Sequence, residues 1–334
     1  MNKKIIFISW TNFSRHSQLL AQFFGAEIFF INNFIHSRKI IWRLFFWIDY
    51  LSKSIRSGRI IHNQKPDVVI VQSPPSILPI LVMFLKIFGS FKVMVDSHNA
   101  AFEKPWAQIP LYKWSLRHAD VVTIHNHQLL NNLKNDIVYS GINFKVLNSR
   151  LTDFSNFKKT DQVQPYILIV TTFSVDEPVK TLLDGIVEFH NKYNSDLIFK
   201  LTGNYNKDYK LYTEFSDYKY IEFLGYIDEQ KYTYCLLNAY GIMSLSTRDD
   251  VQQFSITEAI SAEIPFISNI NSTNCDLFGD KMILTEITSH SISLNINKFI
   301  TKRILLQNNI IEIKKDLSEK WDRSFVQIKN ELDF

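Results

Sequence analysis

The sequence predicts an α/β protein with two Rossmann-like domains in succession, each built on a parallel sheet. Two observations predict this fold class. The chain has 334 residues, of which 46% are hydrophobic, and this is enough for two domains that each bury a core. Short apolar runs also alternate with longer helix-like segments, and parallel strands need such crossovers because a tight turn cannot join them.

The expected strands are short runs rich in β-branched residues, and turn residues follow each of them. In the first half of the chain they are Ile5–Ser9, Val68–Gln72, Phe91–Asp96 and Val121–His125. In the second half they are Tyr166–Thr171, Ile198–Thr202, Ile221–Phe223, Gly241–Leu245 and Pro265–Ser268. Neither first strand is followed by Gly-x-Gly-x-x-Gly, which argues against a dinucleotide-dependent dehydrogenase.

A polar segment, Asp153–Gln164, separates the two series of strands and is the expected linker. We therefore expect an N-terminal domain in residues 1–155 and a C-terminal domain in residues 165–315, facing a central cleft. Residues 316–334 are expected to form a C-terminal helix able to cross back to the first domain. Trp321, Phe325 and Ile328 fall on one stripe of that helix, as in an amphipathic helix.

Composition narrows the class of protein. The most apolar stretch, Ile77–Phe88, contains Pro79 and Lys86 and is far shorter than the roughly 20 residues of a spanning helix. The N-terminus lacks the apolar region of a signal peptide. The two cysteines, Cys235 and Cys275, form neither a disulfide framework nor a metal-ligand pattern. A cytoplasmic protein is expected.

Charge is distributed unevenly along the chain. Residues 1–150 hold 18 Lys and Arg against 7 Asp and Glu, and the remainder holds 19 against 26, so the two parts carry +11 and −7. A basic first half indicates an anionic partner. No nucleic-acid-binding motif is present, so we expect no nucleic acid but an anionic membrane surface or a phosphate-bearing acceptor. Within Ser37–Ile61, basic and aromatic residues alternate, which fits peripheral membrane contact or an ordinary crossover helix with a solvated basic face.

Candidate site residues follow the strand ends, because ligands of open α/β sheets bind beyond the carboxyl ends of the strands. The strongest segment runs from Ser246 to Pro265. We expect a helix to open there at Ser255, and its N-terminus suits a diphosphate. Arg248 could add charge-assisted hydrogen bonds, and Glu258 could accept hydrogen bonds from sugar hydroxyls. An equally good alternative is a capping box, in which Ser255 and Glu258 only satisfy the helix.

A resemblance to a known family rests on this segment. Glu258-Ala-Ile-Ser-Ala-Glu-Ile-Pro265 resembles the Glu-Ala-Met-Ala-x-Gly-x-Pro segment of GT-B glycosyltransferases, especially family 4 and its bacterial relatives that make polysaccharides and lipid-linked saccharides. In that family two acidic residues bracket the donor sugar and ribose, and here they fall on Asp250 and Glu258. The usual Gly-Phe-Gly is replaced by Val251-Gln-Gln.

Other segments of the second half resemble the family in order and spacing. Leu201-Thr-Gly203-Asn204 is similar to its strand-end glycine segment, and Ile221–Tyr226, with Gly225, is similar to an element beside the nucleobase pocket. The loop that begins at Thr172 and Phe173 takes the place of the diphosphate loop but lacks its arginine and usual lysine. The resemblance thus implies donor contacts from Thr172, Phe173, Gly203, Asn204 and Gly225.

In the first half, Gln72-Ser-Pro-Pro75 and Asp96-Ser-His98-Asn99 resemble acceptor-side turns of the same enzymes. The resemblance makes His98 and Asp96 the candidate catalytic pair, with His98 reaching the substrate and Asp96 orienting it or acting as a base. The candidate acceptor-binding residues are Arg15, His16 and Asn99. His125 and His127 lack a comparable match and are interpreted as structural.

These residues and the resemblance together predict a glycosyltransferase, with transfer from a nucleoside diphosphate sugar to a glycan or lipid-linked acceptor in cell-surface polysaccharide biosynthesis, such as capsule or exopolysaccharide. No cofactor and no metal are expected, since no Asp-x-Asp lies in a suitable loop. Two alternatives stay open. One is a nucleotide-sugar 2-epimerase of the GT-B fold, and the other is a non-enzymatic two-lobed sugar-binding protein.

Overall fold

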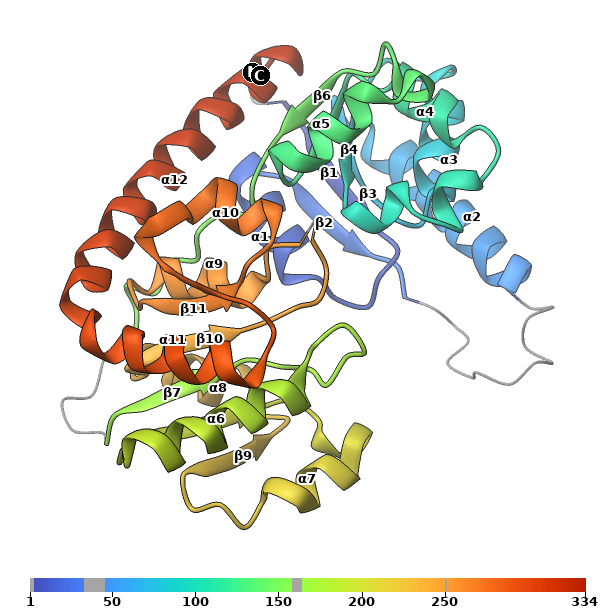
Figure 1. The fold of residues 1–334 in the computed structure, drawn as a ribbon. Coiled ribbons are helices and arrows are strands. Elements are labelled where there is room, and N and C mark those ends of the chain that lie inside the picture. Colours follow the sequence, from blue (N-terminus) through green and yellow to red (C-terminus); the bar gives the residue numbers. More distant parts are fainter. Residues whose placement is uncertain (1–2, 33–45, 158–163, 250) are drawn as a thin grey trace. The chain divides into compact units, whose positions relative to one another are not determined.

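The computed structural model describes residues 3–32, 46–157, 164–249 and 251–334. Within it the chain divides into two compact units. Unit 1 comprises Met1–Arg150 together with Lys320–Phe334, and unit 2 comprises Leu151–Glu319. Each unit is built around its own six-stranded sheet (Figure 1). The predicted fold class, α/β with two Rossmann-like parallel sheets, is confirmed.

Unit 1 has a parallel sheet in the order β2-β1-β3-β4-β5-β6. Helices alternate with the strands along the chain, so each crossover leads back to a parallel neighbour. The elements are β1 (Ile5–Ser9), α1 (Arg15–Phe24), β2 (Glu27–Phe30), α2 (Phe46–Gln64), β3 (Val68–Ser73), α3 (Ile77–Lys86), β4 (Lys92–Ser97), α4 (Tyr112–His118), β5 (Val121–Ile124), α5 (His127–Asn135) and β6 (Phe144–Val146).

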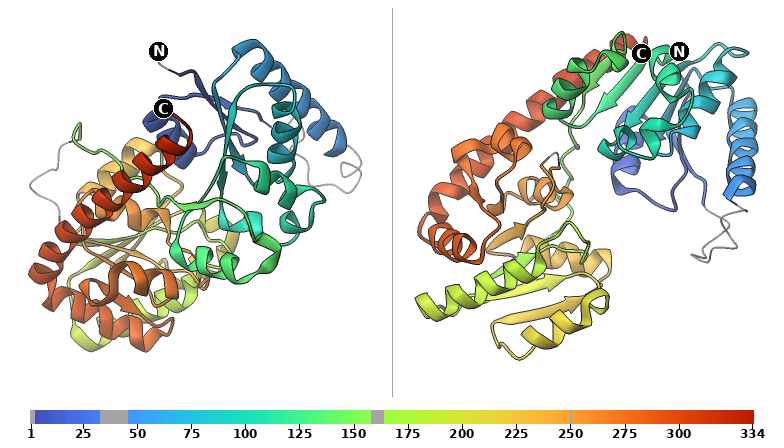
Figure 2. Two further views of the ribbon diagram at one scale, coloured as in Figure 1. Left: turned by 90° about the horizontal axis from the view of Figure 1, so that it is seen from above. Right: turned by 45° about the vertical axis from the view of Figure 1, so that its right-hand side comes forward.

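The two faces of this sheet bury different helices. In β1, Ile6 and Ile8 belong to the core under α2–α5, whereas Ile5 and Phe7 belong to the core on the opposite face. This alternation is the two-residue period of a strand. The second face is covered by α1 and by the end of the last helix, α12 (Arg303–Glu331), with Trp321 buried. The N-terminal and C-terminal segments lie side by side in this unit, where Lys3 Nζ donates to Leu332 O at 3.4 Å (Figure 2).

Unit 2 repeats the architecture with the order β12-β11-β10-β7-β8-β9, also all parallel. One continuous core lies on both faces of its sheet. The remaining elements are β7 (Tyr166–Ile169), α6 (Val179–Tyr193), β8 (Ile198–Thr202), α7 (Tyr209–Phe215), β9 (Ile221–Gly225), α8 (Glu229–Leu237), β10 (Gly241–Ser244), α9 (Phe254–Ser261), β11 (Phe266–Asn269), α10 (Ser272–Phe278), β12 (Ile283–Thr285) and α11 (Ser289–Thr301).

The expected strands are present within a few residues of their predicted ends, but the sequence missed three. These are β2, β6 and β12. All three are edge strands, and they are short, with partly exposed side chains in β2 and β6. An edge strand is half solvated and does not need the continuous apolar run that marks a buried strand.

Two further segments differ from the sequence expectation. The expected linker begins with residues that pack in unit 2: Phe154 lies against its core, and the backbone N–H of Thr152, just before it, donates to Ser261 Oγ at 2.9 Å. The final helix begins at Arg303 instead of near Ser318. Its first part supplies Leu306, Ile310 and Ile313 to the core of unit 2. Across the described ranges, no helix combines the length and the apolar character that a membrane crossing requires.

Candidate functional site

The carboxyl edge of the unit 2 sheet collects most of the predicted donor-binding residues. The chain leaves β7 toward β8 on one side, and β10 pairs with β7 on the other. The strand order therefore reverses between β7 and β10, and ligands of open α/β sheets bind at such a point. The loops that follow β7 and β10 contain Thr172, Phe173 and Arg248.

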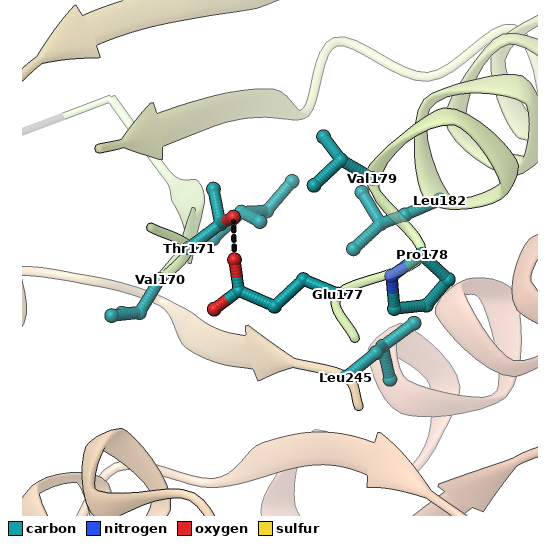
Figure 3. Close-up of a pocket in the computed structure, with 8 residues that line it drawn as sticks. Val170, Thr171, Glu177, Pro178, Val179, Leu182 and Leu245 are labelled. Atoms are coloured by element: carbon teal, nitrogen blue, oxygen red, sulfur yellow. Dashed lines mark hydrogen bonds between the residues drawn. The ribbon is translucent and has the colours of Figure 1, made fainter. Parts of the chain in front are cut away.

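The loop after β7 is organised by the carboxylate of Glu177. Its Oε2 accepts hydrogen bonds from Thr171 Oγ1 at 2.7 Å, from the N–H of Thr172 at 2.8 Å and from the N–H of Ser174 at 3.0 Å. Figure 3 shows this carboxylate turned toward Thr171 beside a small void lined by Val170, Pro178, Val179, Leu182 and Leu245. The N–H groups of Thr172, a predicted donor-binding residue, and of Ser174 thus already bind an anionic group of the chain itself.

Asp176 joins this loop to the one after β10. Its Oδ2 accepts from Ser246 Oγ at 3.1 Å, and its carbonyl oxygen accepts from the N–H of Thr247 at 2.8 Å. Arg248 is the next residue, and its N–H donates to Ser246 Oγ at 3.2 Å. The two loops on either side of the reversal point are therefore one connected structure, with Arg248 beside it.

The loop after β10 is also fastened to α10. Asp249 Oδ1 accepts from the N–H of Ser272 at 2.9 Å, and Asn271 Nδ2 donates to the carbonyl oxygens of Arg248 and Val251 at 3.2 and 3.0 Å. The hydrogen bonds from Ser272 hold the pKa of Asp249 below its ordinary value. Asp250, the first predicted acid of the family pair, lies outside the described residues.

Helix α9 begins at Phe254, within one residue of the expected start at Ser255, and the alternative of a capping box made by Ser255 and Glu258 does not form. Gln253 is the N-cap residue and makes no side-chain cap hydrogen bond. Ser255 lies inside the first turn, because the extended backbone of Gln253 leads directly into the helix. Both side-chain polar atoms of Gln253 are buried, and neither has a hydrogen-bond partner within the described residues.

Glu258 lies one turn further along α9 and is only 4% exposed. Its Oε2 accepts a hydrogen bond from the hydroxyl of Tyr232, on α8, at 2.6 Å. A buried carboxylate held in this way is oriented by its partner. The sequence missed Tyr232, which no local motif marks because it comes from a different helix.

The three remaining predicted donor residues lie at the ends of β8 and β9. Gly203 has a φ of +101°, and a Cβ at this position would lie 2.2 Å from the carbonyl oxygen of Thr171. Its N–H donates to the carbonyl oxygen of Gly225 at 2.9 Å. Asn204 Oδ1 accepts from the N–H of Asn206 at 3.2 Å. Gly203 is thus required for the close approach of β7 and β8, while Asn204 supports a local turn.

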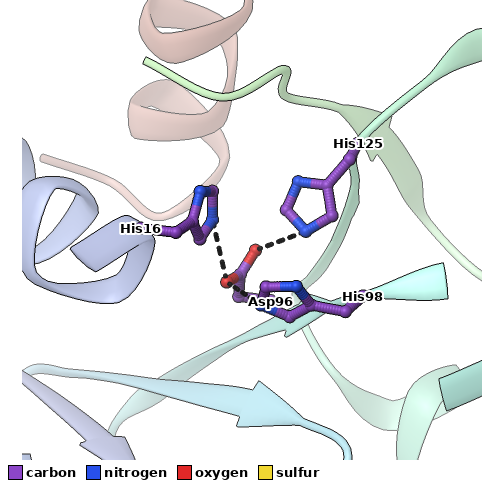
Figure 4. Close-up of side chains that lie close together, drawn as sticks. All are labelled: His16, Asp96, His98 and His125. Carbon is purple, nitrogen blue, oxygen red and sulfur yellow. Dashed lines mark ion pairs between the residues drawn. The ribbon is translucent and has the colours of Figure 1, made fainter. Parts of the chain in front are cut away.

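A second cluster occupies the carboxyl edge of the unit 1 sheet. Asp96 and His98 come from the end of β4, His125 follows β5, and His16 is on α1. Figure 4 shows the three imidazole rings around the Asp96 carboxylate. The Nε2 atoms of His16 and His98 lie 3.4 and 3.6 Å from Asp96 Oδ2, and His125 Nε2 lies 3.8 Å from Oδ1.

Burial and charge act in opposite directions on this cluster. Asp96 is 1% exposed. Burial by itself raises the pKa of Asp96, but the adjacent His16, His98 and His125 hold the pKa of this carboxyl well below its usual range. Burial, reinforced by the neighbouring His98, lowers the pKa of His125 to about 3. The cluster therefore holds an ionised carboxylate and a neutral His125 ring at neutral pH.

A hydrogen-bond network orients His98. The side-chain oxygen of Gln72, at the end of β3, accepts from the hydroxyls of Ser9 and Ser17, the latter at 3.1 Å. Its amide nitrogen therefore faces His98 and donates to Nε2 at 3.2 Å. His98 is 30% exposed and is the most exposed of the four cluster side chains. It is the cluster residue that a substrate can reach.

The other predicted acceptor residues lie near this cluster in the chain. Arg15 opens α1 directly before His16, and Asn99 directly follows His98 at the start of a short 3-10 helix, Asn99–Phe102. Both are half-buried. His125, which the sequence analysis interpreted as structural, lies within this cluster, and its ring faces His16 and His98 at centroid distances of 4.8 and 4.6 Å. The feature of the sequence that could have indicated this was the position of His125 at the end of a predicted strand.

No protein-family model and no curated protein matches the sequence. Solved structures match over nearly the whole chain. HepE of Anabaena, in complex with UDP and glucose, matches with a TM-score of 0.73 and 12% identity over 99% of this chain and 100% of that one. The sucrose-phosphate synthase of Thermosynechococcus elongatus matches with 0.70 and 12% identity over 98% of both chains. MnaA of S. aureus, with UDP, matches with 0.60 and 16% identity over 92% and 91%. The chain therefore has the GT-B fold.

Proposed function

We propose that this protein is a glycosyltransferase that takes a sugar from a nucleoside diphosphate sugar. The fold supports this proposal, since the similar HepE structure is described in complex with UDP-glucose as well as with UDP. The resemblance of Glu258–Pro265 to the family segment supports it independently, because that segment lies on α9 beside the reversal point of the unit 2 sheet.

The observation that carries the proposal is the N-terminus of α9. The first N–H groups of a helix have no partner within the helix, and the side chain of Gln253 does not cap these. Such an end attracts a diphosphate through its free donors and its dipole. Arg248 adds a positive charge on the preceding loop, and the buried Glu258 lies one turn behind, where a carboxylate can accept hydrogen bonds from sugar hydroxyls.

On the acceptor side we propose that His98 contacts the reacting hydroxyl. Asp96 is too deeply buried for a substrate to reach it, so its role is to orient the histidines around it. Of the two roles that the sequence left open for Asp96, burial favours orientation over direct proton removal. His16, a member of the cluster, and Arg15 and Asn99, which are each next to a cluster residue in the chain, are proposed to complete the acceptor side.

The first test is a thermal-shift screen of the whole chain against nucleoside diphosphates and their sugars. A ligand that binds only the native state raises the melting temperature by mass action, and we expect UDP or another nucleoside diphosphate to do so. Product analysis with the donor alone then tests the alternative of an epimerase, which would change the sugar without an acceptor. A chain that binds no nucleoside diphosphate would contradict the proposal.

The second test is Glu258→Gln. A hydrogen bond to a charged partner contributes about 1.5–3 kcal/mol, so we expect kcat/KM to fall about 100-fold with little change in melting temperature. Glu222→Gln is the matched control, because Glu222 lies on the same unit but pairs with Lys200 at the surface. A large loss of stability in Glu258→Gln, with donor affinity unchanged, would assign Glu258 a purely structural role.

We further propose that the acceptor belongs to cell-surface polysaccharide biosynthesis and that α2 contacts an anionic membrane. Part of the segment Ser37–Ile61 lies outside the described residues. In the described part, Trp47, Ile48 and Leu51 are 75%, 58% and 62% exposed, an apolar stripe suited to a lipid interface. Co-sedimentation with vesicles containing phosphatidylserine should weaken in Trp47→Ser with Leu51→Ser. Equal sedimentation of the double variant would contradict the contact.

A further inference from the structure

Four buried polar atoms, on three side chains of the unit 1 cluster, have no hydrogen-bond partner among the described residues. They are Nε2 of His16, Oδ2 of Asp96 and both ring nitrogens of His125. Buried polar atoms are almost always paired, and leaving one without a partner lowers the stability of the fold. Four such atoms within one cluster therefore indicate that something absent from the protein chain satisfies them.

Among the described residues, only one oxygen of the Asp96 carboxylate has a hydrogen-bond donor. Its Oδ1 accepts a hydrogen bond from Thr123 Oγ1 at 3.1 Å, whereas Oδ2 faces His16 and His98. The Nε2 of His98 accepts a hydrogen bond from Gln72, so it carries no proton that it could donate to Oδ2. Two atoms of partial negative charge lie 3.6 Å apart there, and a nearby positive charge would stabilise this arrangement.

The spacing fits a tetrahedral transition-metal ion. Zinc bonds to histidine nitrogen and carboxylate oxygen are about 2.0–2.2 Å long, which places neighbouring ligand atoms about 3.3 Å apart. The corresponding distances here are 3.4 Å from His16 Nε2 to Asp96 Oδ2 and 3.8 Å from His125 Nε2 to the other oxygen, Oδ1. One ligand atom from each of the four residues lies within 4.8 Å of the others.

The donor types select the class of metal. Mg²⁺ and Ca²⁺ take oxygen ligands, whereas imidazole suits Zn²⁺ and its neighbours in the first transition series. A metal-bound carboxylate is normally held by an outer hydrogen bond, and Thr123 supplies that bond to Asp96. The set of two imidazoles and one carboxylate, with a position left open, also occurs in catalytic zinc sites.

We propose that His16, Asp96 and His125 bind a Zn²⁺ ion in unit 1, with the fourth position open toward His98. From the sequence we expected no metal; the three ligands come from three separate segments of the chain and form no short motif. The ion satisfies His16 Nε2, Asp96 Oδ2 and one ring nitrogen of His125. It also leaves His98, the most exposed member of the cluster and the one already bonded to Gln72, outside the set of ligands.

Metal binding is independent of sugar transfer and is measured without donor or acceptor. The full chain, free of any histidine tag, is loaded with Zn²⁺, dialysed against metal-free buffer and examined by elemental mass spectrometry. We expect one zinc per chain and a melting temperature that falls when EDTA removes it. Co²⁺ in its place should give the visible absorption of a four-coordinate ion. A chain that keeps no metal would overturn the proposal, whatever its transferase activity.

Variants test which residues are ligands. Loss of an outer-shell partner alone lowers metal affinity about 10–100-fold, so His16→Ala and His125→Ala should each lower zinc affinity about 100-fold or more. Thr123→Val should lower it about 10-fold, whereas His98→Ala and the surface control His62→Ala should keep one zinc per chain. Circular dichroism shows whether each variant is folded. Because two ligand variants are compared, the test remains valid if one of them fails to fold. Retention by both ligand variants, or loss in His98→Ala, would overturn the three-ligand assignment.

Discussion

The loops at the carboxyl edges of the two sheets differ in how their polar groups are hydrogen-bonded, although both sheets are parallel. In unit 2 the polar groups at the carboxyl edge largely bond one another: Glu177 binds the backbone of its own loop, and Asp176 joins that loop to Thr247. In unit 1, within the described ranges, the carboxyl edge holds His16, Asp96 and His125 with unpaired atoms. The comparison teaches that the loops of unit 2 are held largely by the chain itself, with Gln253 as an exception, whereas the unit 1 cluster keeps unpaired atoms that the proposed metal ion would bind.

Tryptophan distribution makes this comparison measurable. All six tryptophans lie in unit 1, so tryptophan fluorescence follows the unfolding of unit 1 alone. The unfolding of unit 2 can be followed separately by hydrogen-exchange mass spectrometry of its peptides in urea. Each variant below therefore has an internal control in the unit that it does not change.

The largest expected effect is that of Gly203→Ala. A Cβ at this position would meet the Thr171 carbonyl oxygen at 2.2 Å, on a backbone with a φ of +101°. We expect unit 2 to lose about 3 kcal/mol, since strained backbone alone costs about 1–3 kcal/mol. Gly25→Ala is the control, because Gly25 also has a positive φ but no atom within 4 Å of the added Cβ. Its cost should be only about 1–2 kcal/mol. Equal losses would show that the loops of unit 2 are not tightly packed.

Glu177→Gln should have the next largest effect. The substitution keeps the shape of the side chain but removes the charge that accepts from the N–H groups of Thr172 and Ser174. Charge-assisted hydrogen bonds are about twice as strong as neutral ones, so unit 2 should lose about 1–2 kcal/mol in urea unfolding. Glu222→Gln, which breaks only a surface pair, should cost less than about 0.5 kcal/mol. If both variants behave alike, Glu177 does not organise its loop.

His125→Phe is expected to change stability much less when metal is absent. Neither ring nitrogen of His125 has a hydrogen-bond partner in the described part of the chain, so the substitution removes no paired group. In buffer with EDTA, the unfolding of unit 1 by tryptophan fluorescence should shift by less than about 1 kcal/mol. A loss of stability as large as that of Gly203→Ala would mean that His125 stabilises the folded unit 1 without any added group.

The smallest effect concerns an isolated histidine of unit 2. His190 stacks on Tyr220 with ring centroids 3.6 Å apart, and burial lowers its pKa. The unfolded chain therefore binds more protons below pH about 6.5, so this residue makes unit 2 less stable as the pH falls through that value. In His190→Phe, the dependence of unit 2 stability on pH between about 5 and 7 should become shallower. An unchanged slope would exclude His190 as its source.

The sequence predicted the interior of both sheets well because buried parallel strands need apolar, β-branched runs. Strands β1 and β8 have the predicted bounds. Edge strands such as β2 escaped prediction because solvent faces part of them. At the site, a local motif singled out Arg248 and Glu258, and the start of α9 was predicted to within one residue, which is the usual ambiguity of helix ends. Tyr232 was not singled out, and His125 was interpreted as structural, since only helix packing and strand order bring them to their partners.

Helix α12 gives a final consequence, for the order in which a growing chain can mature. Its residues Leu306, Ile310 and Ile313 belong to the core of unit 2, and Trp321 and Ile328 belong to a core of unit 1. A ribosome makes α12 after both sheets. The face of the N-terminal sheet that holds Phe7 and Ile70 is therefore covered by α1 alone until α12 has been translated. Unit 1 begins to fold first but completes its core only after unit 2 has been made, and its partly covered face is where a chaperone would bind in the meantime.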